Sequence, residues 1–525
     1  MLKTGQPTTL DRVLGGVERL GNRLPSPFVM FVGLFVLIAL ASWLAAALGA
    51  TVQLPGAAEA TPVKNVLSGE GLVELLGSAV DNFVEFPALG PVLTVVLGVG
   101  VAQGTGALEA AVRLAFYRVP RSLVPYVVAF VACQGHVMSD ASFLVIPPLA
   151  ALVFSAVGRH PLAGLIGAYA CTATGYAGGL LLGTLDASLA GITEKAAALL
   201  PGTDGYSTNI AMNYYFGAAA GLVLPIVGGL LISRVLEPRL PAWRPGKGSG
   251  DGPGAGPGDG PGHGRDGARV EVTPQERRAL LVSGLVVAGF LALVVVAWLI
   301  PGSPLRDPDG SLVPSPLLSN LVPIIALVFF LFGYTYGRVI GLAKKDRDVY
   351  AMMTTAIKEM GGFITLIFIV AQTLSVLSWS GLATFLAVEL ADAAKAVGLV
   401  GFPALVFLVL LSMVLNLVIT SGSGLWSLES TVMVPALMLL GLSPAIIQAT
   451  HRIGDSITQA ISPMHIFLYF ILAAAQKYEP GLKLGTLVSR LLPFVPAFGL
   501  VWVGVLAVFY FVGLPVGPGA SIQLP

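Results

Sequence analysis

Between Arg121 and Arg159 the chain reads SLVPYVVAFVACQGHVMSDASFLVIPPLAALVFSAVG (122–158), an apolar run with a polar centre. The run is long enough for two membrane segments, but CQGHVMSDAS (133–142) is too polar to face lipid. Arginine flanks both ends, and basic residues accumulate on the cytoplasmic side of a membrane. This pattern predicts a re-entrant helical hairpin whose turn is buried in protein. The alternative is two ordinary spans joined outside.

A second apolar run, about 400–442, has a similar design, with TSGSGLWSLES (420–430) at its centre. The first run holds SDAS (139–142) followed by Pro147, and the second holds SLES (427–430) followed by Pro435. Both fit Ser-x-x-Ser-x4-Pro, although so short a pattern also arises by chance. Alternation of the spans makes the second run enter from outside, which predicts two hairpins of opposite orientation in an inverted-topology repeat.

The composition supports a membrane protein. The chain has 525 residues and a mean hydropathy of +0.85, with 55% hydrophobic and only 11% charged residues. Soluble domains carry about 25% charged residues. A soluble enzyme, a nucleic-acid-binding protein and a disulfide-rich secreted module are therefore excluded. Since no nucleotide-binding loop is present, active transport by this chain would have to use an ion gradient.

The basic residues orient the chain, because most of the 29 fall on segments that can lie together in the cytoplasm. The segments 51–84 and 184–210 hold one lysine each and are assigned outside. The third span unwinds in its glycine-rich stretch, 171–179. Nine spans are predicted, at about 28–50, 85–108, 160–183, 212–232, 280–300, 319–336, 361–379, 444–475 and 491–512.

This topology predicts a multi-pass protein of the inner (cytoplasmic) membrane, with the N-terminus in the cytoplasm and the C-terminus outside. Residues 246–267, rich in Gly, Pro and Asp, read as a flexible cytoplasmic linker. The predicted units are a cytoplasmic segment 1–27, membrane half 28–245 with hairpin 122–158, the linker, membrane half 268–513 with hairpin 400–442, and an external tail 514–525.

Charged side chains inside spans are costly and are therefore candidates for function. Arg452 and Asp455 lie one helical turn apart, so they can pair, as a structural ion pair or as a site at which the guanidinium binds a carboxylate or sulfonyl group. Asp186 holds the matching place in the first half. It can carry a proton or bind Na⁺, or it is an external or helix-capping aspartate. No firm metal site is predicted, with Na⁺ near Asp186 or Asp455 as the option.

The second turn adds three candidates for substrate binding: Ser423, Trp426 and Asn416. Trp426 can stack on an aromatic ring or anchor packing, and Asn416 can contact substrate, contact a cation or link two helices. Helix N-termini at both turns, together with Arg452, favour an anionic substrate.

The first turn supplies weaker candidates, His136, Ser139 and Asp140. His136 and Asp140 either relay protons or form a hydrogen-bonded structural pair.

In these residues the chain resembles the AbgT family of transporters, which is linked to p-aminobenzoyl-glutamate uptake and to export of sulfonamide antimetabolites. The resemblance covers nearly the whole chain. It is carried by SGSGLW (421–426), by Pro444 with RIGDS (452–456), by GTLD with LAGIT within 183–193, and by the opening segment 10–25. Leu425 and Glu429 stand at positions that vary.

The resemblance implies an all-α homodimer with nine transmembrane helices and two opposed hairpins in each copy. It implies functional roles for the matching positions, namely Asp186, Asn416, Trp426, Pro444, Arg452 and Asp455, and Ser423 fits the hairpin position. The expected protein is not an enzyme and has no cofactor, and H⁺ or Na⁺ couples the movement of a small aromatic anion by an elevator-like exchange of access. No nucleic acid is an expected partner. The alternatives are the same architecture carrying dicarboxylates or short-chain fatty acids, and a channel.

Overall fold

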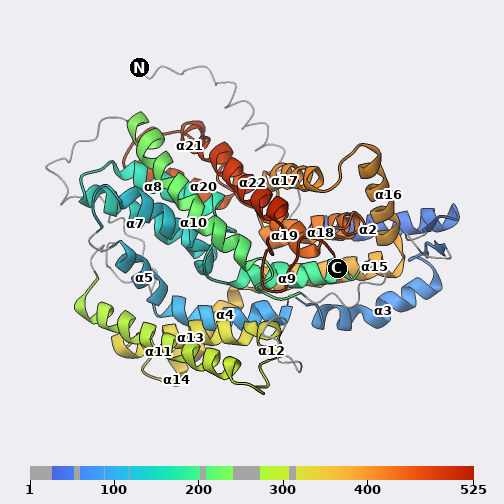
Figure 1. Ribbon diagram of the computed structural model, residues 1–525, viewed down its shortest axis with the longest axis horizontal. Helices are drawn as coiled ribbons and strands as arrows, with labels where there is room; N and C mark the ends of the chain where they lie inside the picture. The colour runs from blue at the N-terminus through green and yellow to red at the C-terminus, as the bar shows by residue number, and fades with distance from the viewer. Residues whose placement is uncertain are drawn as a thin grey trace.

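The computed structural model describes residues 27–52, 60–87, 89–116, 119–200, 208–240, 272–306 and 315–524. The predicted linker 246–267 and nearly all of the predicted segment 1–27 lie outside these ranges. The described chain is a helical protein, as predicted (Figure 1). Its one sheet is a short antiparallel ribbon of β1 (Thr51–Val52) and β2 (Thr61–Pro62).

Five helices form one group at the lower left of Figure 1, and α4 connects this group to the rest of the protein. They are α4 (Leu89–Gly104), α5 (Ala107–Ala115), α11 (Pro274–Leu299), α13 (Leu321–Ile340) and α14 (Asp346–Glu359). A Cβ atom on Gly98 would lie 2.1 Å from the Ala326 carbonyl oxygen, and one on Gly333 would lie 2.5 Å from the Cα atom of Ala102. The two glycines therefore let the backbones of α4 and α13 touch, as small residues do between membrane helices.

Two similar series of helices surround the centre of the molecule. The first unit comprises α6 (Val124–Cys133), the 3₁₀ turn η1 (Gly135–Met138), α7 (Ala141–Ala156), α8 (Pro161–Thr174) and α9 (Thr184–Ala197). The second unit comprises α17 (Phe402–Asn416), α18 (Gly422–Met438), α19 (Pro444–Gln459) and α20 (Ile466–Gln476). Each unit is a helix pair followed by an interrupted helix, and the break between α8 and α9 falls in the predicted glycine-rich stretch.

The Ser-x-x-Ser-x4-Pro patterns do not occupy equivalent places in the two units. Ser139 and Ser142 lie at the turn before α7 and in its first residues, whereas Ser427 and Ser430 lie well inside α18. The two units are thus alike in the order of their helices and in the places where the helices are interrupted. The Ser-x-x-Ser-x4-Pro patterns are not part of this similarity.

The remaining helices cover these units. They are α2 (Pro27–Ala47), α3 (Gly69–Val84), α10 (Tyr214–Leu230) with its extensions η2 (Leu231–Leu236) and η3 (Glu237–Arg239), α12 (Pro316–Ser319), α15 (Gly361–Trp379), α16 (Leu382–Ala396), α21 (Leu484–Leu491) and α22 (Phe494–Val512). The tail after α22 folds back, and the Ser443 amide donates to the Ile522 carbonyl (2.8 Å) at the start of α19.

Seven helical stretches of the described residues are long and apolar enough to cross a membrane. Each overlaps one of the predicted spans, and only the third and the eighth predicted spans have no such stretch. Those two are the interrupted helices, α8 with α9 and α19 with α20, whose halves are too short to cross alone. The count of nine spans and the re-entrant path of the helix pairs stay predictions.

Two segments that the sequence assigned to the outside have more structure than expected. Helix α3 forms within 51–84, where the Ser68 side chain caps it by accepting a hydrogen bond from the Gly71 amide (3.1 Å). Helix α9 forms within 184–210 and packs against α18, α4 and α19. Most of α9 is buried among these helices. The assignment of 184–210 to the outside stays a prediction.

Candidate functional site

A polar cavity of about 490 Å³ lies where the turns of the two units meet. The first unit lines it with the end of η1 and the start of α7, and the second with the start of α18. Helices α4, α14 and α15 supply apolar wall residues such as Val96, Ala356 and Phe363. Six serine and threonine side chains line the cavity: Ser139, Thr184, Ser188, Thr420, Ser421 and Ser423. The cavity thus combines polar turns with an apolar wall.

Four helices begin at this cavity, because the first residues of α7 (Ala141), α9 (Thr184), α18 (Gly422) and α20 (Ile466) all line it. The first amide groups of a helix have no partner within the helix, and the helix dipole places partial positive charge there. Lysine and arginine are missing from the described lining residues. Partial positive charge at this surface therefore comes from the helix N-termini, beside the acidic lining residues Asp140 and Glu359.

Arg452 lies in the core and binds Asp186 across the two units, with 2.8 Å between Nη2 and Oδ1. The predicted pair of Arg452 with Asp455 is therefore wrong. The other oxygen of Asp186, Oδ2, accepts the Gly183 amide (2.8 Å) and so caps the start of α9. Asp186 is both a helix cap and the counter-ion of Arg452, and the salt bridge joins α9 to α19.

Asp455 instead binds Asn416, whose Nδ2 donates to Oδ1 at 2.8 Å. Thr458 donates to Asn416 Oδ1 at 3.1 Å, so this cluster connects the end of α17 to α19. The second carboxylate oxygen of Asp455 lies directly behind the start of α18, where a Cβ atom on Gly422 would come within 2.9 Å of it. Asp455 is thus separated from the cavity by one glycine.

Trp426 is fully buried and does not line the cavity. Its Nε1 donates to Thr193 Oγ1 (2.8 Å), and its ring lies 4.5 Å from that of His451. Thr193 also accepts Gln448 Nε2 (2.6 Å), and Gln448 bonds Asn213 of α10. In this arrangement Trp426 links α18 to α9.

Pro444 is the first residue of α19 and is also remote from the cavity. Gln459, at the other end of the same helix, does line it. At 1.5 Å per residue the two lie roughly 20 Å apart along the helix. Of the predicted substrate-binding residues, the structure places only Ser423 on the cavity surface.

The first turn brings Ser139 and Asp140 to the cavity but not His136. His136 Nε2 lies 2.8 Å from the Leu181 carbonyl oxygen, and Nδ1 has no partner. The predicted pair of His136 with Asp140 is therefore wrong. Ser139 is the only described residue other than glycine with a positive φ, which is 48°. Its Oγ lies 3.1 Å from Thr184 Oγ1.

The sequence reasoning missed several residues of this region. Tyr176, Gln459 and His465 line the cavity, and they come from the two helix breaks or next to them. Glu429 and His451 form a buried hydrogen-bonded pair (2.7 Å). Polarity within an apolar span is the signal that could have indicated all five.

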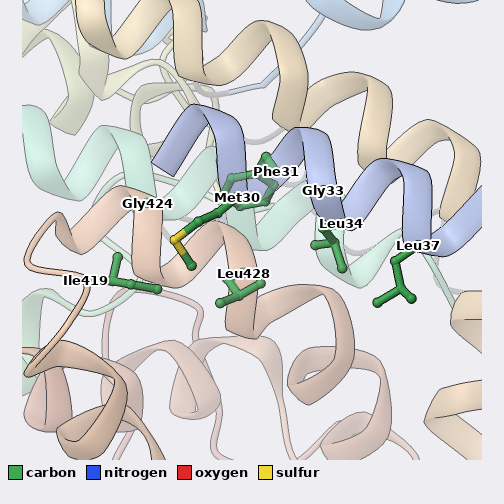
Figure 2. A pocket seen from close by; sticks show the side chains of 8 residues that line it. All are labelled: Met30, Phe31, Gly33, Leu34, Leu37, Ile419, Gly424 and Leu428. Carbon is green, nitrogen blue, oxygen red and sulfur yellow. The ribbon is translucent and has the colours of Figure 1, made fainter. Parts of the chain in front are cut away.

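A second cavity, about 250 Å³, lies between α2 and the start of α18 (Figure 2). All the labelled side chains are apolar: Met30, Phe31, Leu34 and Leu37 come from α2, and Ile419 and Leu428 face them beside Gly33 and Gly424. No polar side chain is among its described lining residues, so of these two cavities the polar one is better suited to an anion. No cluster of three or more His, Cys, Asp or Glu that could hold a metal occurs among the described residues.

Comparison with known proteins identifies the family. The profile of the AbgT putative transporter family matches residues 12–524. The p-aminobenzoyl-glutamate transport protein of Escherichia coli K12 is 37% identical over 516 residues, which is 98% of this chain and 97% of that protein.

Two solved structures agree with this assignment. The antimetabolite efflux pump MtrF of Neisseria gonorrhoeae is 34% identical with a TM-score of 0.87, over 97% of this chain and all of that one. The YdaH transporter of Alcanivorax borkumensis is 33% identical with a TM-score of 0.83, over 94% of this chain and all of that one. The chain belongs to the AbgT family of membrane transporters, and it is not an enzyme.

Proposed function

We propose that this transporter moves p-aminobenzoyl-glutamate, related aromatic acids and sulfonamide antimetabolites across the inner membrane, driven by a gradient of H⁺ or Na⁺. The observation that carries the proposal is the cavity at which four helices begin. Helix N-termini suit carboxylate and sulfonyl oxygens, and the apolar wall suits an aromatic ring. The names of the relatives agree with such substrates.

Asp186 and Asp455 are the proposed ion-coupling carboxylates, and the contacts favour Asp455. Asp186 is committed to Arg452 and to the Gly183 amide. Asp455 has only a neutral amide at Oδ1, and its other oxygen faces the start of α18. A proton or a sodium ion that neutralises Asp455 would remove a buried charge from the side of the cavity.

An elevator-like exchange of access, with a homodimer as the fixed frame, completes the proposal. The group of α4, α5, α11, α13 and α14 is a candidate frame, since its helices pack mainly on one another. The two units would move past α4 and carry the cavity between the two sides. The cytoplasmic N-terminus and external C-terminus rest on the distribution of basic residues.

The test is transport in proteoliposomes that contain the purified protein. Radiolabelled p-aminobenzoyl-glutamate and sulfamethazine are offered separately under an imposed pH gradient, an imposed Na⁺ gradient and no gradient. We expect accumulation under one of the gradients and a slow equilibration without either. No movement of either compound in either direction under any gradient would refute the proposal.

A dicarboxylate is the second candidate substrate, because helix N-termini bind carboxylates whether or not a ring is attached. Competition against labelled p-aminobenzoyl-glutamate separates the two. Succinate in excess should compete weakly if the apolar wall contributes to binding. Competition by succinate at concentrations as low as those of the unlabelled aromatic acid would favour the dicarboxylate.

A further inference from the structure

Glu429 and His451 form a buried titratable pair for which the proposed function has no role. His451 Nδ1 lies 2.7 Å from Glu429 Oε2, and the two side chains are 1% and 0% exposed. Ser412 of α17 donates to the same carboxylate oxygen at 2.7 Å. The other oxygen, Oε1, and the second ring nitrogen of His451, Nε2, have no hydrogen-bond partner. A buried polar atom without a partner is rare and calls for an explanation.

The hydrogen bonds indicate which ring nitrogen of His451 is available to bind a proton. A carboxylate only accepts hydrogen bonds, so Nδ1 of His451 carries a hydrogen and donates it to Glu429. Nε2 then holds a lone pair when the ring is neutral and a proton when the ring is charged. Uptake of one proton at Nε2 converts the pair from a net charge of −1 to neutral.

The buried charged side chains around the pair have a net negative charge, and binding of a proton would reduce it. Within the described residues, Asp186, Glu429, Arg452 and Asp455 are the buried charged side chains. Arg452 and Asp186 neutralise each other, so Asp455 and Glu429 remain. Helix α17 carries no charged residue, and Glu389, Asp392 and Lys395 of α16 lie on the exposed side of that helix or near its exposed end. Glu194 and Lys195 lie at the far end of α9, where Thr208 bonds Glu194.

The pair also links helices α18 and α19 and contacts a residue that is bonded to α9. Glu429 is on α18, whose first residues line the cavity, and His451 is on α19, which carries Arg452 and Asp455. The ring of Trp426 packs on His451 and is hydrogen-bonded to α9. A change of charge at His451 therefore acts on the contacts among α9, α18 and α19, the helices that hold the cavity together.

We propose that Glu429 and His451 form a proton-binding site of the transport cycle, with His451 Nε2 as the atom that takes up the proton. This inference rests on the proposed function and narrows its coupling ion to H⁺. The protonated, neutral pair belongs to the state in which the units move. The deprotonated pair, with its buried negative charge, holds the protein in one orientation.

The first experiment separates coupling from substrate movement. Glu429→Gln, His451→Gln and the wild-type protein are reconstituted, and two activities are measured with labelled p-aminobenzoyl-glutamate: exchange without a gradient and accumulation driven by a pH gradient. We expect both variants to retain exchange and to lose accumulation by about tenfold or more, a size typical of coupling between two sites. Glu276→Gln, which removes the acid of the Arg113–Glu276 pair (2.6 Å) far from this cluster, is the matched control and should keep both activities.

The outcomes are distinct. Accumulation at the wild-type level in either variant overturns the proton site, and so does wild-type accumulation that follows only a Na⁺ gradient. If the wild-type protein moves no substrate at all, the proposed function fails, and the proton site is then decided by the measurement below.

The second experiment reads the proton without transport. A protonated imidazole quenches the fluorescence of an indole that it touches, and Trp426 touches His451. The chain has six tryptophans, so Trp426→Phe supplies the blank to subtract. We expect a quenching step as the pH falls, unchanged in Glu276→Gln and absent in His451→Gln. The absence of a step in the wild-type protein, or a step that survives in His451→Gln, overturns the proposal.

Discussion

The two units are alike in helix order and unlike in where they hold their charges. The first unit contributes one buried charged side chain, Asp186, and the second contributes three, Glu429, Arg452 and Asp455. The first unit instead exposes an acid, Asp140, at the cavity. A charge in the core needs a partner, so the second unit depends on Asp186 across the interface. The buried charges are therefore divided unequally: three lie in the second unit, and Asp186, the counter-ion of Arg452, lies in the first.

The turns differ as well. The first turn is a 3₁₀ helix that ends at Ser139, whose φ of 48° strains a side-chain-bearing residue. The second turn ends at Ser421, which has an ordinary extended backbone and caps α18 by accepting the Gly424 amide (3.3 Å). The first turn is held in a costly shape by its surroundings, and the second is a regular helix start.

The largest effect is expected from breaking the charge pair that joins the units. Arg452→Gln leaves Asp186 buried without its counter-ion, which destabilises a protein by about 3–5 kcal/mol and should abolish transport. The thermal midpoint in detergent and transport in proteoliposomes measure the two effects. Arg452→Gln combined with Asp186→Asn removes both charges and should regain most of the stability without regaining transport. A single variant that melts and transports like the wild-type protein would show that the pair does not join the units.

A smaller effect is expected from a methyl group at the glycine that begins α18, compared with one at the glycine that caps α9. Gly422→Ala places a Cβ atom 2.9 Å from Asp455 Oδ2, whereas at Gly183 in the first unit the nearest atom would be 3.9 Å away. Overpacking of this kind costs about 1–3 kcal/mol, so transport should fall roughly tenfold in Gly422→Ala. Gly183→Ala, the matched control, should stay within about twofold, since its cost is below 1 kcal/mol.

Initial transport rates at equal protein content measure this difference. Equal loss in the two variants would mean that glycine at these helix starts matters for flexibility. Loss in Gly422→Ala alone would mean that the close approach to Asp455 is the sensitive feature.

The sequence predicted what depends on local composition. Long apolar helices, the break near 171–179 and the burial of Arg452 and Asp455 all follow from patterns that a membrane imposes on the chain. It also indicated that helix starts would face the substrate, although it pointed to two such starts and the cavity has four.

What depends on distant contacts was not predictable. Spacing within α19 made Asp455 the obvious partner of Arg452, but packing of α9 brings Asp186 closer. The segment that contains α9 was assigned outside because it holds a single basic residue, Lys195. That count gave no indication that α9 packs against α18, α4 and α19. The position of Trp426, facing Thr193 and away from the cavity, likewise depends on that helix.

The smallest effect is expected from releasing the strain at the first turn, and it tests whether the turns truly differ. Ser139→Gly removes the side chain that disfavours a positive φ, which should raise stability by about 1 kcal/mol, reduced by loss of the contact with Thr184. Ser421→Gly at the second turn relieves no strain and loses a cap, so it should lower stability by a few tenths of a kcal/mol. The thermal midpoints of the two variants should therefore move in opposite directions. Movement in the same direction would show that the unusual backbone of Ser139 is fully compensated by its surroundings, and that the two turns differ in shape but not in stored energy.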